Sequence, residues 1–237
     1  MRMADVDRIR KALDNRPFGF TPSYDGKTDM RSVEDAISQD TAAKVPILIG
    51  TNADEGSVLT SAMPAPQLIL EGIFGNDTAA LAAARAAYPA NATDEELKSR
   101  IQTDYAYTCT TSAIASTAAR AGYSVWRYYF DASFPNTQPF PGAGAWHTSE
   151  ISLVFGTYPR NNETTAQQIR LSRFLQRSWA DFAKDPYGGP GWASVGGAGE
   201  DLEVIGANGT AWGESVEEQT VDEICRLYMA AIQKNGL

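Results

Sequence analysis

Histidine and cysteine are scarce in this sequence, which has one histidine, His147, and two cysteines, Cys109 and Cys225. A single histidine excludes a histidine-rich metal site, and the cysteines do not form a C-x-x-C pair. Two cysteines fit either one disulfide or two reduced, buried thiols. If the protein transfers protons near neutral pH, His147 is the side chain whose ordinary pKa suits the task.

Basic residues and long apolar runs are also lacking. Lysine and arginine number 20 against 29 aspartates and glutamates, giving a net charge of -9. An acidic chain is a poor candidate for binding nucleic acid or an anionic membrane surface. No apolar run is long enough to span a bilayer. The first residues lack the apolar segment of a signal peptide, so we expect any secretory signal to lie upstream.

Glycosylation signatures are comparatively frequent. N-x-[ST] sequences in polar, loop-like contexts begin at Asn76, Asn91, Asn162 and Asn208. One such sequence is weak evidence, but together the four point to the secretory route. We therefore expect a secreted, extracellular protein, an environment in which a disulfide would persist.

The apolar pattern predicts short strands separated by helices. With 43% hydrophobic residues over 237 positions, the chain can form a sizeable core. Strands are predicted at 45–51, 123–130 and 202–205. Helices are predicted at 6–13, 64–74, 78–88, 94–107, 112–121, 167–183 and 221–232. Residues 17–27 are turn-rich and predict a loop. We find no repeat or true linker, and the predicted fold class is α/β.

Two polar segments stand out against this pattern. The sequence PILIGTNADEGS (46–57) continues the first predicted strand into a polar loop, where functional side chains gather in α/β sheets. The sequence GAWHTSEISLVFG (144–156) places His147 after a loop rich in proline and glycine. Taken alone, Glu55 would be an acidic residue at a helix N-terminus, and His147 a structural or exposed histidine.

Together these segments resemble the acid and histidine segments of the type-B carboxylesterases, the cholinesterase and fungal lipase branch of the α/β-hydrolases. The acid precedes the histidine, as the order of that fold requires. The helix at 167–183 is similar as well. The resemblance implies that residues 1–237 are the C-terminal part of one α/β-hydrolase domain. They would hold the later strands of its central sheet with packed helices, and an absent N-terminal segment would complete the fold.

The resemblance also assigns roles to residues. His147 would take the proton of a serine hydroxyl and return it to the leaving alcohol, while Glu55 would hold the imidazole in the correct tautomer. Asp54 is the main rival for the acid, and Glu150 is interpreted as structural. The family carries its nucleophile on a Gly-x-Ser-x-Gly turn before the acid.

That turn is missing from this chain. None of the serines before Glu55, which are Ser23, Ser32 and Ser38, has flanking glycines in that pattern. We therefore expect the nucleophile and the oxyanion hole in an upstream segment, and hydrolysis of a carboxylic ester without a metal or organic cofactor. A half sheet would expose a strand edge, so we also expect a tightly associated N-terminal partner chain from the same precursor. The alternative is that the chain folds alone with a rebuilt edge.

Finally, the resemblance implies a disulfide between Cys109 and Cys225, with the reduced pair as the alternative. Three other functions remain open. The chain could be a non-catalytic, cholinesterase-like adhesion or binding protein, or a fragment that is inactive on its own. It could also be a hydrolase that uses Ser215 in GESVE (213–217), although Glu217 would crowd the tight turn and we expect a surface loop there.

Overall fold

The computed structural model describes residues 5–13, 33–60, 63–197 and 199–235. It divides the chain into two compact units, Met1–Ser32 and Val33–Leu237. In the first unit the described part is the predicted helix, α1 (Val6–Leu13), whose first turn is capped by the Asp5 carboxylate. The loop predicted at 17–27 lies outside the described residues.

The second unit contains a sheet of four strands in the order β1-β2-β3-β4, counted over the described residues. Strands β1 (Ile47–Asn52), β2 (Val125–Phe130) and β3 (Leu202–Ile205) are parallel, and β4 (Gly213–Val216) pairs antiparallel with β3. Parallel strands joined through helices make this an α/β fold, as predicted. The loop predicted around Ser215 is wrong: its polar residues form an edge strand that pairs on one side only.

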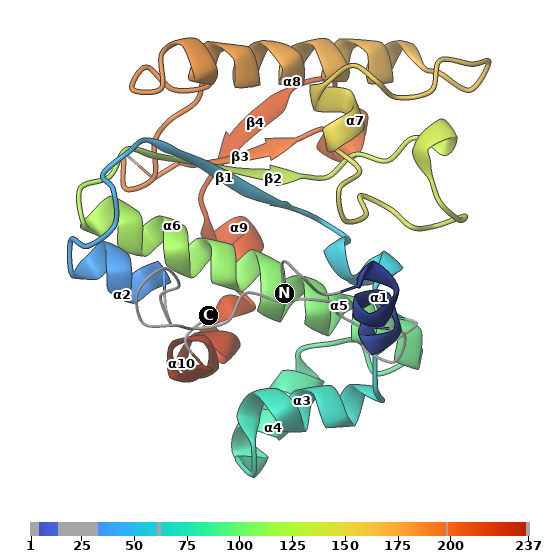
Figure 1. The fold of residues 1–237 in the computed structure, drawn as a ribbon, viewed down its shortest axis with the longest axis vertical. Coiled ribbons are helices and arrows are strands. Elements are labelled where there is room, and N and C mark those ends of the chain that lie inside the picture. Colours follow the sequence, from blue (N-terminus) through green and yellow to red (C-terminus); the bar gives the residue numbers. More distant parts are fainter. Residues whose placement is uncertain (1–4, 14–32, 61–62, 198, 236–237) are drawn as a thin grey trace. The chain divides into compact units, whose positions relative to one another are not determined.

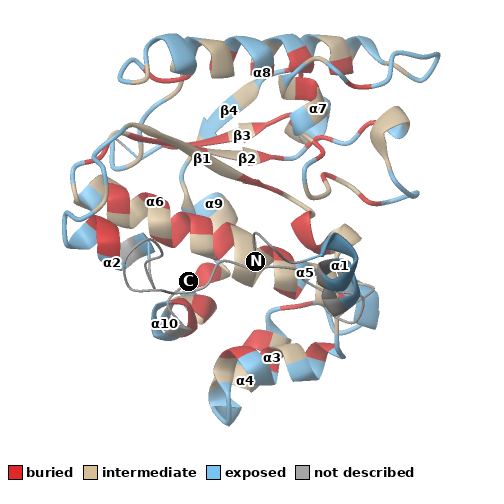
Figure 2. Cartoon of the chain, viewed as in Figure 1, coloured by how far each residue is buried: buried red, intermediate tan, exposed pale blue. Residues whose placement is uncertain are grey.

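Helices cover both faces of the sheet (Figure 1). Helix α8 (Ala166–Lys184) and the short α7 (Ile151–Val154) lie over one face, where Leu171 and Leu175 pack with Phe130. Helices α6 (Thr110–Arg120) and α2 (Val33–Ser38) lie over the other. The faces of α6 and α8 that are turned to the sheet are the buried ones (Figure 2). Side chains on β2 alternate between the two layers, as the pleat requires.

The region predicted as helices at 64–74, 78–88 and 94–107 forms α3 (Pro66–Phe74), α4 (Thr78–Ala86) and α5 (Asp94–Gln102). The last prediction is wrong beyond Gln102, because the chain continues as a π-helical turn, η3 (Thr103–Cys109). In this turn Thr103 accepts from Gly56 in the segment after β1, Tyr107 packs against His147, and Cys109 packs into the core. Helical periodicity alone cannot distinguish this turn from an α-helix, and such turns are frequent at functional sites.

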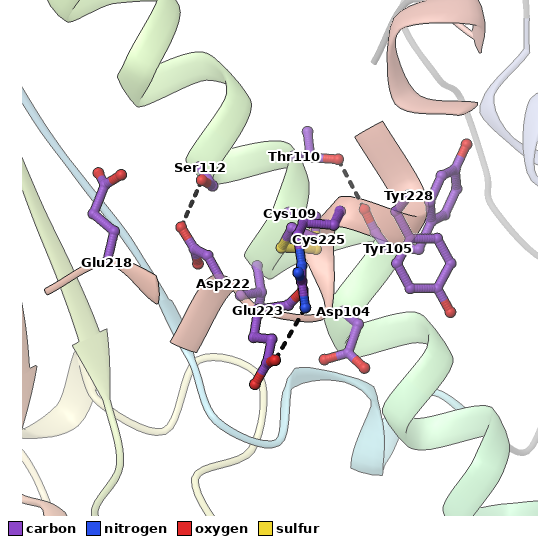
Figure 3. The surroundings of a disulfide bond; sticks show 12 residues. Asp104, Tyr105, Cys109, Thr110, Ser112, Glu218, Asp222, Glu223, Cys225 and Tyr228 are labelled. Atoms are coloured by element: carbon purple, nitrogen blue, oxygen red, sulfur yellow. Dashed lines mark hydrogen bonds and ion pairs between the residues drawn. A yellow bond between two sulfur atoms is a disulfide. The ribbon is translucent and has the colours of Figure 1, made fainter. Parts of the chain in front are cut away.

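The C-terminal helix predicted at 221–232 is divided into α9 (Gln219–Asp222) and α10 (Cys225–Asn235). Cys225 at the start of α10 is bonded to Cys109 of η3, which confirms the predicted disulfide (Figure 3). Tyr228 stacks on Phe74 beside it and is fully buried. The bond therefore joins the C-terminal helix to the helical region that follows the first strand. None of the described helices is both long and apolar enough to cross a membrane.

Short 3-10 turns complete the connections. They are η1 (Glu55–Val58), η4 (Pro135–Thr137) and η5 (Ala207–Gly209). The asparagines of the four N-x-[ST] sequences are all exposed and lie in turns or in η5.

Candidate active site

The acid segment is held in place by a glycine that admits no side chain. Strand β1 ends at Asn52, and the chain turns into η1, which begins with the buried Glu55. The N–H of Gly56 donates to the Thr103 hydroxyl at 2.9 Å. A Cβ at Gly56 would lie 2.2 Å from the Ser99 carbonyl oxygen, so only glycine allows η1 to pack this closely against α5.

The histidine segment is tied to the residue before Glu55. The N–H of Ala145 donates to the Asp54 carboxylate at 2.9 Å, and the N–H of Asp54 donates to the Ala145 carbonyl at 3.0 Å. Gly144 has a φ of 70°, and a Cβ there would lie 2.0 Å from Asp54 Oδ2. Asp54, the rival candidate for the acid, therefore holds the backbone that leads to His147.

Glu55 and His147 are in direct contact. Oε2 of Glu55 lies 2.5 Å from Nδ1 of His147, although the two residues are 92 positions apart in the chain. The Glu55 side chain is only 7% exposed, whereas that of His147 is 40% exposed. Within the described residues, Nε2 of His147 has no hydrogen-bond partner. One ring nitrogen is thus engaged by a buried carboxylate and the other is available to a reactant.

The environment of the pair is partly apolar. Burial raises the pKa of the Glu55 carboxyl, and the N–H of Asn52 and the contact with His147 oppose this. The Tyr107 ring packs against the imidazole, with 5.2 Å between ring centroids. A carboxylate that is poorly solvated gains from a positive charge beside it. It therefore favours the imidazolium that forms when Nε2 takes a proton.

The backbone next to His147 adopts an unusual conformation. Thr148 has a φ of 76°, in the left-handed region that a β-branched residue rarely enters. The turn is supported by hydrogen bonds from the Ser149 N–H to the Trp146 carbonyl and from the Ile151 N–H to the Thr148 carbonyl. Such strain persists only where the surroundings enforce it, and it is concentrated at functional sites.

Asn52 belongs to this site but was not predicted from the sequence. It is 1% exposed, and its amide group contacts three residues of the histidine segment: Trp146, Ser149 and Glu150. Glu150 accepts from the Asn52 amide at 2.6 Å, so it ties the histidine segment to the end of β1, which is consistent with its interpretation as a structural residue. A polar residue at the end of an apolar strand was the available signal, since buried amides need partners.

Ser215 lies elsewhere. It is on β4, at the opposite end of the strand order from β1, and its hydroxyl donates to Glu203 of β3 at 2.7 Å. The structure does not bring it to His147. A cavity of about 610 Å³ lies next to the acid segment and is lined in part by Asp54, Ser57, Asp104 and Tyr129. Neither Glu55 nor His147 lines this cavity.

Comparison with known proteins places this geometry in a family context. The model of the "Carboxylesterase family" matches residues 2–220. Para-nitrobenzyl esterase of Bacillus subtilis is 29% identical over 196 residues, which are 78% of this chain and 38% of the relative. Secreted lipase 5 of Gibberella zeae is 29% identical over 158 residues, which are 63% of this chain and 25% of the relative.

Comparison with solved structures also finds an esterase. A solved structure of a PNB esterase superposes on 94% of this chain with a TM-score of 0.69 and 25% sequence identity. The matched region is 47% of that structure's chain. This chain therefore spans less than half the length of these relatives, and it corresponds to part of an α/β-hydrolase fold.

Proposed function

Because the chain belongs to the carboxylesterase family, we propose that it supplies the acid and the base of a Ser-Glu-His triad that hydrolyses carboxylic esters. The observation that supports this most directly is the contact between Glu55 and His147 Nδ1, with Nε2 left open to a reactant. The serine nucleophile and the oxyanion hole belong to a segment upstream of this chain.

The proposed chemistry follows from the two ring nitrogens. With Nδ1–H donating to Glu55, Nε2 is the unprotonated nitrogen and accepts the proton of the serine hydroxyl as its oxygen attacks the ester carbonyl carbon. The imidazolium then returns that proton to the departing alcohol oxygen, which leaves an acyl-serine. In the second half, Nε2 takes a proton from water as the water oxygen attacks the acyl carbon. The imidazolium then returns that proton to the serine oxygen as its bond to the acyl carbon breaks, which releases the acid and restores the serine hydroxyl.

We propose that the upstream segment docks on the free edge of β1. The N–H groups of Ile47 and Ala53 donate to carbonyls on the β2 side, so the alternation of a parallel ladder turns those of Leu48 and Gly50 to the other side. Among the described residues no strand pairs with that side. The adjoining Val45 is 56% exposed, which is unusual next to an apolar strand.

We further propose that the protein is extracellular and glycosylated. The disulfide, the four exposed N-x-[ST] asparagines and the likeness to a secreted lipase support this location. Detection of glycan on any of Asn76, Asn91, Asn162 or Asn208 in material from a secreting host would bear it out. Secreted material with no glycan on any of these four asparagines would contradict the proposed glycosylation.

The activity is tested in the assembled protein, this chain together with its upstream segment. His147→Ala should lower ester turnover by about 10⁴-fold or more, because the residues of a triad act as a unit. Ser215→Ala is the matched control and should retain full turnover, because its hydroxyl faces Glu203. Unchanged turnover in His147→Ala would reject the triad. An assembled wild type without ester turnover would favour the adhesion or binding alternative.

The partner proposal has its own test. Size-exclusion chromatography with mass analysis of the native material should show this chain with a second segment. A stable, monodisperse species of 25.6 kDa would instead mean that the chain folds alone.

A further inference from the structure

Asn52 contacts Glu55 and also the segment that carries His147. We propose that it is the positioning residue that keeps Glu55 and His147 in hydrogen-bonding contact. This inference rests on the proposed function for its catalytic consequence. Its structural claim, that Asn52 sets the hydrogen bond between the two residues, stands on the contacts alone. Asn52 is the last residue of β1, and its side chain is buried.

The backbone of Asn52 fixes the acid. Its N–H lies on the side of β1 that faces away from β2, and it donates to Oε1 of Glu55 at 2.8 Å. Oε2 of the same carboxylate is then directed to Nδ1 of His147. Because β1 is paired with β2 along its length, up to Asn52 opposite Phe130, this donor cannot move independently of the sheet. The Glu55 carboxylate is therefore held by a rigid element, strand β1.

The side chain of Asn52 fixes the histidine segment. Nδ2 lies 2.9 Å from the carbonyl oxygen of Trp146, immediately before His147, and 2.6 Å from Oε2 of Glu150, three residues after it. An amide nitrogen carries two hydrogens, and these two contacts use both of them. The contact with the Ser149 hydroxyl, at 3.4 Å, is secondary. The loop is thus anchored on both sides of the imidazole by the residue that anchors the acid.

These contacts require an amide. A carboxylate at this position has no hydrogens to donate and would lie against Glu150, where two like charges repel each other. An alanine would leave the Trp146 carbonyl and the half-buried Glu150 carboxylate without their donor. In either case the backbone N–H of residue 52 would still hold Glu55. The expected defect is therefore a displaced imidazole rather than a displaced acid.

Because this chain has a single histidine, the prediction can be measured by NMR on isotope-labelled chain assembled with its unlabelled upstream segment. In wild-type protein, His147 should give one imidazole NMR signal set, with a strongly downfield Nδ1 proton from the bond to Glu55. In Asn52→Asp that proton should disappear or move upfield, while the amide signals of β2 and β3 stay in place. Asn52→Ala is the second variant and should behave alike. Asn161→Ala is the control, because the exposed Asn161 side chain accepts from the Glu163 N–H in a surface turn.

In the assembled esterase, Asn52→Asp should lower kcat by about 10- to 100-fold with KM within about twofold, as expected for a misplaced catalytic group. An unchanged Nδ1 proton in both Asn52 variants would overturn the positioning role. So would a kcat equal to that of Asn161→Ala. If the assembled wild type has no ester turnover, the proposed function fails, and the NMR comparison still decides whether Asn52 positions His147.

Discussion

Two pairs, each of an acidic and a basic side chain, join distant parts of this chain, and they differ in how completely they are enclosed. Glu55 and His147 are 92 residues apart, and Arg127 and Asp222 are 95 residues apart. The Arg127 side chain is fully buried, and Asp222 receives two of its hydrogen bonds, at 2.5 and 2.8 Å. His147, by contrast, leaves one ring nitrogen without a partner in the described structure and is 40% exposed.

The surroundings of Arg127 are closed by further partners. Its guanidinium also donates to the Thr108 carbonyl at 3.3 Å, and the Ser112 hydroxyl donates to Asp222 at 2.6 Å. Arg127 lies within β2 and points toward α6, so helices and sheet surround it. Glu55 instead lies beyond the end of β1, where the chain leaves the sheet. We infer that the Arg127–Asp222 pair stabilises the fold and that the Glu55–His147 pair is available for chemistry.

The same acid-to-amide change at the two pairs should separate these roles. Asp222→Asn leaves the buried charge of Arg127 without its main counterion and should lower the free energy of unfolding by about 3–5 kcal/mol. Glu55→Gln should change it by no more than about 1 kcal/mol, because burial already disfavours the ionised carboxylate and raises its pKa. Urea unfolding of both variants measures the difference. Equal losses would show that the two pairs do not differ in this way.

Loss of the disulfide is the next largest expected effect, and the bond lies beside the enclosed Arg127–Asp222 pair. It joins Cys109 to Cys225 of α10, 116 positions later. Cys109 directly follows Thr108, whose carbonyl accepts from Arg127. Replacing both cysteines by alanine should lower stability by about 2–5 kcal/mol. Urea unfolding of the double variant against the wild type measures this loss. Mass spectrometry of unreduced, alkylated wild type should find no free thiol, and two alkylated cysteines would contradict the bond.

A third acid, Asp104, should make the stability of the fold depend on pH. It lies in η3, it accepts from the Tyr88 hydroxyl at 2.8 Å, and burial raises the pKa of its carboxyl from 3.8 to about 6. The folded state therefore binds this proton more tightly than the unfolded chain. Its contribution to stability is fully present below pH 3.8 and is lost as the pH rises through about 6.

Asp104→Asn keeps an oxygen for Tyr88 and removes the titration. The variant should lose the fall in stability that accompanies Asp104 ionisation between pH 4 and 6. At pH 7 it should be more stable than the wild type by a few kcal/mol, on the order of 3. Thermal or urea unfolding at pH 4, 5, 6 and 7 measures this. A variant with the same pH profile as the wild type would mean that Asp104 does not titrate in this range.

Much of the fold could be predicted because its signals are local. The apolar run before Glu55, the aromatic strand β2 and the amphipathic α8 follow from periodicity within short windows. The roles of Glu55 and His147, like the disulfide pairing, came from the resemblance of their segments to a known family.

The features that the sequence did not predict depend on contacts from elsewhere in the chain. The π-helical turn η3 continues the helical pattern of α5, and only its contacts with Gly56 and His147 distinguish it. Strand β4 has polar, exposed residues and is a strand only because β3 offers its edge. The signal at Asn52 is only a polar residue at the end of an apolar strand, and its partners are defined when the histidine segment folds against it.

The sequence by itself determined which residues can do chemistry here. One histidine, one acid segment and two cysteines leave few combinations, and local patterning sets the helices and most strands around them. Only the tertiary structure decided that Glu55 rather than Asp54 meets His147, and that Asn52 lies between their segments. It also decided that Arg127 finds Asp222. The physical reason is that these partners are more than 90 positions apart, so the strand order and helix packing bring them together.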